Sequence, residues 1–547
     1  MLIPKGTRSA DNILQRIVNG IERQKHSSNP PAPPASPVNL LPAATGEPSV
    51  YWANFQIPLN LLTGHFLTVG GTGAGKTLLT DRQVKSLIPL CPKGSGNTLV
   101  YFDTKGTAVQ LLEGEGCKDY ILFNISDTRG WGWDIACDYG GSPPKLAEIA
   151  YKIAPPKKDG EPFFRDSSRS ALKAILCSMS HIHPKWRLYW LYQLLQVPIS
   201  QLDLENESFL EAQKGNLVFL QLLWRTLQPK TVAGILGELA LLLDRLQPLF
   251  AHDAYAKKRF SLTELLEKGG VLVISMDLTL RDISEPAIHL LLDCLFDLVN
   301  ARPDSEIKGK KGFLILDECP FLKTLPKLGS MLSFSRSKGW HVSLTAQSIE
   351  QLTDFYPPGE IASIIGNVDN LCLLKNNDPY MNRWISDYFG QEQRVERTIS
   401  ENLGGSGGYT ESQKLEIRPR VLAGALAALP ATSPKTGVYC YLNSPHFQEP
   451  QTCKFFIPAH DIARYAPRYD LTVPGFIPKP LSELIPPAPT QAELEYIVFG
   501  KRPKVVIHNV PQGIPPELIE LVLEEVKRQA KGTLDQLIIE LKRNPKK

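Results

Sequence analysis

The chain has 547 residues, of which 43% are hydrophobic and 21% are charged, and its 60 basic and 56 acidic residues leave a net charge of only +4. These proportions exclude wholesale disorder and predict about three or four folded units, while the weak overall charge makes any contact with nucleic acid depend on local basic patches. No apolar run approaches the roughly 20 residues that a membrane-spanning helix needs.

The N-terminal residues 1–50 are predicted to be a tail and a Pro-rich linker. Ile13–Ile21 has the spacing of a short amphipathic helix, and residues 27–49 are rich in proline, serine and alanine, with little to bury. From Tyr51 onward the composition is that of a globular domain.

Short apolar runs alternate with helical patterns over residues 51–183 and 257–470, which we predict to be two parts of one domain. Runs that are apolar throughout are typical of a parallel sheet covered on both faces, and the alternation predicts βαβ units and an α/β fold. The predicted strands are Phe66–Gly70, Leu99–Asp103, Tyr120–Asn124, Val271–Met276, Phe313–Asp317, Val342–Thr345, Leu371–Lys375 and Val438–Tyr441.

A glycine-rich stretch follows the first of these strands and precedes a predicted helix. It fits the P-loop pattern GxxxxGK[ST]. In that pattern glycines let backbone N–H groups converge on phosphate oxygens, the lysine neutralises the β- and γ-phosphates, and the hydroxyl ligates Mg²⁺. We predict a nucleotide and Mg²⁺ site here, with a plain glycine turn as the alternative; its residues are Gly70, Gly71, Thr72, Gly73, Ala74, Gly75, Lys76 and Thr77.

Residues 184–256 interrupt the alternation and are predicted to form an all-α insertion domain. The stretch from residue 165 to residue 258 contains no convincing strand. Helical patterns cover Asp166–Ser180, Lys185–Leu195, Asn206–Thr226 and Val232–Leu246.

A later apolar strand ends in two adjacent carboxylates, Asp317 and Glu318. Since the carboxyl ends of parallel strands share one edge of the sheet, this pair is expected beside the P-loop. We predict that Asp317 holds the Mg²⁺ shell and that Glu318 polarises the attacking water as a general base. A strand that ends in a solvated turn is the alternative.

Two further side chains follow the acidic pair. Gln347 ends the next predicted strand, where its amide can report the loss of the γ-phosphate; an amide that caps a helix start is the alternative. Arg336 can act in trans on a neighbouring subunit, as arginine fingers do, and a solvated arginine at a helix end is the alternative.

The C-terminal part is predicted to be a Pro-rich linker, 471–489, followed by a small basic α+β region, 490–547. In that region we expect a strand at Lys504–Val510 and helices at Pro515–Gln529 and Thr533–Arg543. This tail, and the lysines at 157–158 and 308–311, are candidate DNA contacts, with solvated surface as the alternative.

The ordered motifs resemble those of the type IV secretion coupling proteins, a family of FtsK/HerA-related, RecA-like ATPases. The match includes a D-x-K-G strand end (Asp103 to Gly106), an FF helix start (Phe163-Phe164), the acidic pair and a Q-S-x-x-Q-L block (Gln347 to Leu352). The Asn-Pro step that the family tends to have near Gly132–Ile135 is missing. The resemblance covers about residues 62–460.

The resemblance implies a RecA-like P-loop sheet interrupted by the all-α insertion. It also implies a homo-hexameric ring that hydrolyses ATP with Mg²⁺ and pumps single- or double-stranded DNA through its centre. The insertion, 184–256, would recruit a relaxase or other secreted cargo. Asp103 and Lys105 would lie near the phosphates, and Arg336 would be the trans arginine.

Most of the family begins with membrane-spanning helices, and this sequence contains none. The scattered cysteines and the lack of a signal peptide predict a cytoplasmic protein, or one held at the inner membrane by an anchored secretion component. Two other functions stay open. One is a soluble FtsK/HerA-type DNA pump in repair or mobile-element processing, and the other is an ATP-dependent docking platform that moves nothing.

Overall fold

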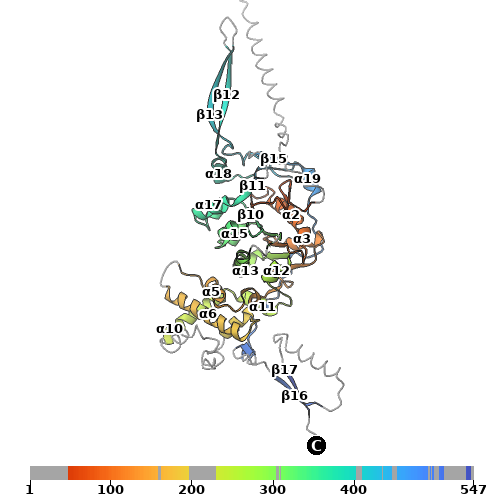
Figure 1. The fold of residues 1–547 in the computed structure, drawn as a ribbon, viewed down its shortest axis with the longest axis vertical. Helices are drawn as coiled ribbons and strands as arrows, with labels where there is room; N and C mark the ends of the chain where they lie inside the picture. The colour runs from red at the N-terminus through yellow and green to blue at the C-terminus, as the bar shows by residue number, and fades with distance from the viewer. Residues whose placement is uncertain are drawn as a thin grey trace, which may run out of the picture.

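The computed structural model describes most of the chain (Figure 1). The predicted helices Ile13–Ile21, Asn206–Thr226 and Pro515–Gln529, and most of the linker at 27–49, lie outside the described residues. The described residues are 47–157, 162–195, 229–303, 307, 309–401, 409–433, 435–445, 453–490, 493–494, 496–497, 504–510 and 538–543.

A nine-stranded sheet forms the centre, in the order β15-β14-β11-β3-β10-β9-β4-β8-β5. The strands from β11 to β5 run parallel, whereas β14 and β15 run antiparallel at one edge. All eight predicted strands belong to this sheet, so the α/β class is confirmed; β15 is an addition. The bounds are β3 His65–Val69, β4 Thr98–Asp103, β5 Tyr120–Phe123, β8 Gly270–Ser275, β9 Gly312–Leu316, β10 Trp340–Ala346, β11 Val368–Leu374, β14 Val438–Asn443 and β15 Cys453–Ile457.

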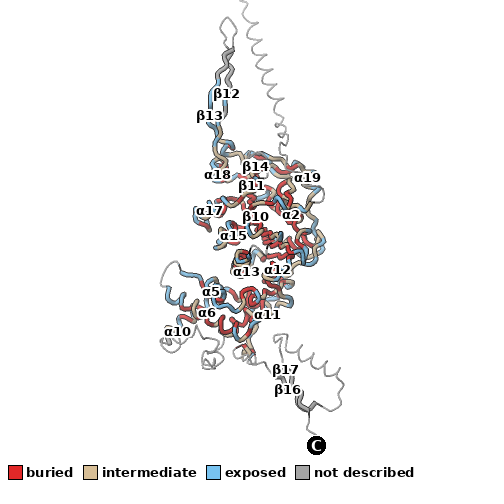
Figure 2. The backbone as a smooth tube through the Cα atoms, viewed as in Figure 1, coloured by how far each residue is buried: buried red, intermediate tan, exposed pale blue. Residues whose placement is uncertain are grey.

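Both faces of the sheet are covered, as the apolar strands predicted. Successive residues of a strand point to opposite faces, so Phe66 joins one hydrophobic cluster while Leu67 and Val69 join the other. Figure 2 shows the buried residues concentrated in this central body.

Different elements cover the two faces. The Phe66 face carries β1 (Ser49–Trp52), β2 (Phe55–Pro58), α2 (Lys76–Leu87) and α3 (Ala108–Gly114). The opposite face carries α4 (Ile135–Tyr139), α12 (Leu262–Lys268), α13 (Arg281–Ala301), α15 (Leu328–Phe334), α16 (Glu350–Thr353), α17 (Pro358–Gly366) and α18 (Pro379–Phe389). The remaining short elements are η1 (Ile88–Leu90), β6 (Gly132–Trp133), β7 (Arg259–Phe260), η4 (Leu278–Leu280), η5 (Cys319–Leu322), α19 (Ala459–Arg464) and η6 (Leu481–Glu483).

A helical part lies at one end of the molecule (Figure 1). Every described element within 184–256 is a helix; α6, which precedes residue 184, packs against α10, and α5 packs against α6. Its buried Trp186, Tyr189 and Phe250 belong to the same cluster as one face of the sheet, so the two parts share a core. The helices are α5 (Pro143–Ile153), α6 (Phe163–Ile182), α7 (Leu188–Leu195), α10 (Pro229–Asp244) and α11 (Gln247–Tyr255).

The segment 466–479, which we call the strap, lies along the outside of the domain. Backbone hydrogen bonds join Asp470 N to Gln110 O, Thr128 N to Ile477 O and Lys479 N to Ser126 O, each at 2.9 Å. Part of the segment predicted to be a linker, 471–489, is therefore pinned to α3 and to the loop after β5. Proline suits such an extended segment because it fixes φ without requiring a strand partner.

Two further pairs of strands complete the described chain. The long antiparallel pair β12 (Gln391–Glu401) and β13 (Tyr409–Pro419), which the sequence did not lead us to expect, projects from the end opposite the helical part (Figure 1). Near the C-terminus β16 (Lys504–Val510) pairs in parallel with β17 (Ile538–Arg543). The strand at Lys504–Val510 is confirmed, and the helix at Thr533–Arg543 is wrong for Ile538–Arg543, where adjacent β-branched residues favour a strand.

Among the described residues, no helix has the length and apolar character needed to cross a membrane.

Candidate active site

The glycine-rich turn connects β3 to α2 at the carboxyl edge of the sheet. Gly73 and Gly75 have φ values of 74° and 104°, in the left-handed region that glycine tolerates best. Gly70 N and Gly71 N bond to Ala346 O at 3.2 Å and Lys375 O at 2.9 Å, which fixes the turn to the neighbouring strands. No described side chain caps α2, so its first N–H groups are available for an anion.

Lys76 begins α2 and folds back over this turn. Its ammonium donates to Gly70 O at 2.7 Å and to Gly71 O at 3.4 Å, and it lies 3.8 Å from Glu318 Oε2. Burial lowers the pKa of Lys76, while the negative charge of Glu318 acts in the opposite direction. The lysine is therefore held at the turn, where it can neutralise phosphate charge.

The acidic pair stands at the end of β9, which is separated from β3 by β10. Asp317 and Glu318 are both buried, and Glu318 has a left-handed backbone with φ 60°. Thr345 on β10 joins them, because its hydroxyl donates to Asp317 Oδ1 at 3.1 Å and accepts from Glu318 N at 2.6 Å. Burial raises the pKa of Glu318, which moves it toward the range of a useful general base.

Gln347, at the end of β10, lies between the turn and the acidic pair. Its backbone N–H donates to Glu318 Oε1 at 3.1 Å, and its side-chain oxygen accepts from the Thr72 hydroxyl at 3.4 Å. Asn376 Nδ2 donates to Gln347 O at 2.7 Å. The Gln347 side chain thus contacts the glycine-rich turn, while its backbone contacts the acidic pair.

Asp103 and Lys105 reach the same edge from the end of β4. The Asp103 carboxylate accepts from Lys105 N at 2.9 Å and from Ala108 N at 2.7 Å, so it shapes the turn before α3. Burial raises the pKa of Asp103. The Lys105 ammonium hydrogen-bonds the Thr77 hydroxyl and lies 3.7 Å from Asp317 Oδ2.

Arg336 lies at the opposite edge of the sheet, in the loop between α15 and β10. It pairs with Asp369 at 3.3 Å, near the start of β11, and its side chain is 58% exposed. A strand of this length spans roughly 15–20 Å, so Arg336 does not join the cluster of its own chain. The structure therefore brings together every predicted site residue except this one.

The residues present fit a divalent cation. Asp317 Oδ2 is buried without a hydrogen-bond partner, and the Thr77 hydroxyl faces the same position through its contact with Lys105. A carboxylate and a hydroxyl are hard oxygen ligands of the kind that Mg²⁺ binds beside nucleotide phosphates. Thr77 and Asp317 would hold the ion.

Two features of this region were not foreseen from the sequence. Asp81 on α2 is buried and accepts hydrogen bonds from Tyr101 and from Tyr469 of the strap. A small cavity beside Glu318 and Gln347 is lined by Arg281, from the start of α13. Both sets of partners are distant in sequence and match no motif, so only the folded chain reveals them.

Comparisons with known proteins give matches that cover most of the chain. A family model described as the type IV secretion-system coupling protein DNA-binding domain matches residues 50–443. The unbound bacterial conjugative coupling protein TrwBdeltaN70 has a TM-score of 0.61 and 19% identity, over 80% of this chain and 92% of that chain. No curated protein sequence matches the chain.

Two nucleotide complexes of the plasmid coupling protein TrwB are also similar. The complex with ADP and Mg²⁺ has a TM-score of 0.58 and 21% identity, over 79% of this chain and 91% of that chain. The complex with the non-hydrolysable ATP analogue ADPNP has a TM-score of 0.57 and 18% identity, over 79% and 92%. Likeness at these identities establishes a shared fold, and the predicted fold class is confirmed.

Proposed function

The chain belongs to the type IV secretion-system coupling protein family, and from this premise we propose that it is an ATPase that translocates DNA and delivers a relaxase–DNA substrate to a conjugation channel. One observation carries the proposal. Lys76 of the P-loop and Glu318, which are far apart in the sequence, lie within 3.8 Å of each other inside the region that the family model matches. Hydrolysis of a bound triphosphate requires a cation at the phosphates and a base for the attacking water within one site, and this closeness supplies both.

In this mechanism the backbone N–H groups of the turn and the Lys76 ammonium hold the β- and γ-phosphates. Thr77 and Asp317 would hold Mg²⁺, which would supply further neutralisation of phosphate charge when bound. Glu318 accepts the proton of the attacking water, and the side-chain amide of Gln347 contacts the γ-phosphate and responds to its loss. The left-handed backbone of Glu318, fixed by Thr345, turns its carboxylate toward Lys76 rather than away from the turn.

We further propose that the chain works as a homo-hexameric ring around DNA, with Arg336 completing the site of a neighbouring subunit. The exposed position of Arg336 supports this, because a group that serves another subunit must lie on the surface. The helical part is assigned to cargo, in line with the exposed apolar side chains Tyr151, Phe163, Phe164 and Leu241 on and near it. The lysines at 157 and 310 are proposed DNA contacts; each has a local partner, Glu238 at 3.4 Å and Glu267 O at 3.1 Å respectively.

The test is ATP hydrolysis with and without DNA, with Lys76→Ala, Glu318→Gln and the exposed control Lys93→Ala. We expect DNA to stimulate the wild type and the control. Lys76→Ala should lose nucleotide binding, because it removes the cation at the phosphates. Glu318→Gln should bind ATP but hydrolyse it at least about 100-fold more slowly, because only the proton acceptor is lost.

Two results would contradict the proposal. If Glu318→Gln hydrolysed ATP at the wild-type rate, Glu318 would not be the general base. If neither single- nor double-stranded DNA changed the rate of hydrolysis, a nucleotide-dependent docking platform would remain as the function.

A further inference from the structure

Lys105 occupies the position where the nucleotide site would hold its metal ion. Its ammonium hydrogen-bonds the Thr77 hydroxyl and lies 3.7 Å from Asp317 Oδ2. These are the two side chains that the proposed function assigns to Mg²⁺. A lysine and a metal ion cannot both occupy a space set by the same two oxygen atoms, so they must exclude each other.

The surrounding charges explain why a cation is needed there before any ligand arrives. Asp317 is 2% exposed, and its Oδ2 atom has no hydrogen-bond partner. Asp81 and Asp103 are also buried nearby, and the negative charges of the three carboxylates repel one another. Lys76 is engaged with Gly70 O and with Glu318, so Lys105 is the positive charge next to Asp317. A buried carboxylate without such a partner is costly.

The backbone around Lys105 is held, while its side chain is free to leave. The Asp103 carboxylate accepts from Lys105 N, and Gly106 has a left-handed φ of 72°. On the outside, Gly475 of the strap approaches so closely that an added Cβ would lie 2.3 Å from Gly106 O. The Lys105 side chain itself is 48% exposed, so rotation about its own bonds can carry the ammonium away without moving the loop.

We propose that Lys105 is the resident counter-ion of the metal position: it neutralises Asp317 and engages Thr77 before a nucleotide binds, and it is displaced when Mg²⁺ arrives with the nucleotide. This inference rests on the proposed function, since it assumes that Thr77 and Asp317 are the metal ligands. Its consequence is an order of binding. Metal alone should bind the nucleotide-free site poorly, whereas a metal–nucleotide complex would bring phosphate oxygens as further ligands of the ion.

The test measures Mn²⁺ binding to the full, nucleotide-free chain by electron paramagnetic resonance. Lys105→Met keeps the length of the side chain and removes its charge, and it should bind one Mn²⁺ roughly tenfold tighter or more than the wild type does. Lys105→Arg should resemble the wild type. Adding Asp317→Asn to Lys105→Met should abolish the gain, which identifies the ion's position.

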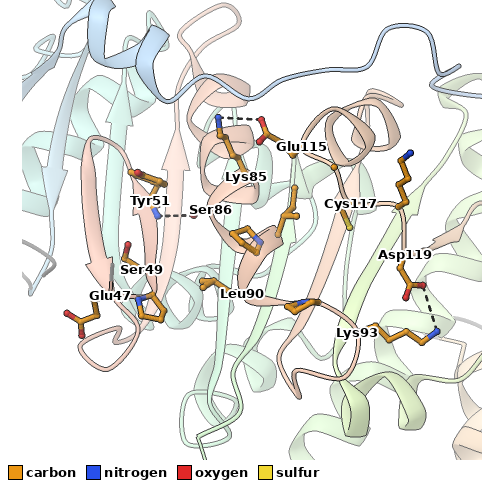
Figure 3. Close-up of a pocket in the computed structure, with 16 residues that line it drawn as sticks. Glu47, Ser49, Tyr51, Lys85, Ser86, Leu90, Lys93, Glu115, Cys117 and Asp119 are labelled. Carbon is orange, nitrogen blue, oxygen red and sulfur yellow. Dashed lines mark hydrogen bonds and ion pairs between the residues drawn. The ribbon is translucent and has the colours of Figure 1, made fainter. Parts of the chain in front are cut away.

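Lys93, in the turn between η1 and β4, offers a matched control. Its ammonium lies 3.8 Å from Asp119, almost the same separation, in an exposed pair beside the hollow seen in Figure 3. Lys93→Met removes the same charge without touching the nucleotide site, so it should leave Mn²⁺ affinity unchanged. Circular dichroism of each variant establishes that it is folded.

Three outcomes overturn the inference. The first is that Lys105→Met binds Mn²⁺ with an affinity within twofold of the wild type. The second is that Lys93→Met gains as much Mn²⁺ affinity as Lys105→Met does. The third is that Lys105→Met loses ATP affinity with no change in Mn²⁺ binding, which would make Lys105 a phosphate ligand. ATP affinity, measured with a fluorescent analogue, distinguishes a failure of the proposed function from a failure of this inference. A wild-type chain that binds no nucleotide contradicts the proposed function, whereas one that binds it normally while Lys105→Met shows no gain contradicts this inference alone.

Discussion

Thr345 shows how one side chain can shape the site without facing the substrate. Its hydroxyl accepts from the N–H of Glu318 and donates to one oxygen of Asp317, so it holds two neighbouring residues for which we propose different roles. Glu318 adopts a left-handed φ of 60°, which is unfavourable for a residue with a Cβ. Such backbone strain persists only where surrounding bonds impose it, and it is frequent at functional sites.

Asp81 gives a pH-dependent prediction at the same scale. Burial raises the pKa of its carboxyl to about 6, against an ordinary value of 3.8. The folded state therefore keeps a proton that the unfolded chain releases, and between about pH 4 and pH 6 this group makes stability fall as pH rises. Above pH 6 the full penalty is present, on the order of 3 kcal/mol.

We expect Asp81→Asn to remove that penalty while keeping an acceptor for Tyr101. The melting temperature of the variant should exceed that of the wild type at pH 7.5, and the difference should shrink toward pH 4.5. Thermal denaturation of both proteins across this range is the measurement. A difference that does not change with pH would show that Asp81 does not titrate in this window.

At the scale of elements, the strap ties three separate parts of the domain together. Tyr469 reaches Asp81 on α2, and Asp470 bonds to Gln110 of α3. Lys479, at its far end, donates to Nδ1 of buried His252 on α11 at 2.8 Å. Burial lowers the pKa of Lys479 to about 8. A segment that looks like a linker by composition thus joins the nucleotide-binding face to the helical part.

Gly475→Ala tests how tightly the strap is held. The added Cβ would lie 2.3 Å from Gly106 O, a backbone atom that cannot rotate away, so we expect a loss of about 1–3 kcal/mol in stability. Gly359→Ala is the matched control. It lies within α17, and an added Cβ there meets nothing within 4 Å, so the change should be neutral or slightly stabilising. Equal melting temperatures for the two variants would contradict the close approach.

At the scale of the whole molecule, the site is incomplete without a second copy in the proposed ring. Arg336 lies at the far edge of its own sheet, so the catalytic role that we propose for it would require a neighbouring subunit. The long pair β12–β13 and the helical part extend from the sheet domain in opposite directions (Figure 1). The sheet domain therefore lies between them in space. In the proposed ring, subunit contacts at the level of this sheet would bring Arg336 to the nucleotide.

A mixing experiment tests this arrangement. Arg336→Ala should bind ATP normally and lose most hydrolysis, and Lys76→Ala should bind none. Mixed in equal amounts, the two should recover measurable hydrolysis, because Lys76→Ala subunits donate Arg336 to intact P-loops. Arg383→Ala, an exposed arginine of α18, is the control and should behave as the wild type. Two inactive proteins that stay inactive when mixed, while still assembling, would rule out action in trans.

Local patterns predicted the sheet well and the rest of the chain less well. Each predicted strand of the sheet is an apolar run closed by a turn, and the ends of each lie within three residues of their observed positions. The pair β12–β13 was not predicted, because its strands are polar and the exposed Val395, Leu415 and Ile417 are too few to form a run. The predicted helix over Ile538–Arg543 is a strand, since its partner lies some thirty residues earlier, at Lys504–Val510.

The sequence by itself determined the P-loop, the acidic pair and the α/β class, because each depends on chemistry within a short stretch: glycines for the turn, a lysine for phosphate, an apolar run for a buried strand. Only the tertiary structure decided the strand order that places β10 between β3 and β9, the contact of Lys105 with Thr77 and Asp317, and the course of the strap. These features depend on which distant residues meet when the core closes. Burial of apolar surface favours that closure without specifying the partners, and packing of the whole chain then selects them.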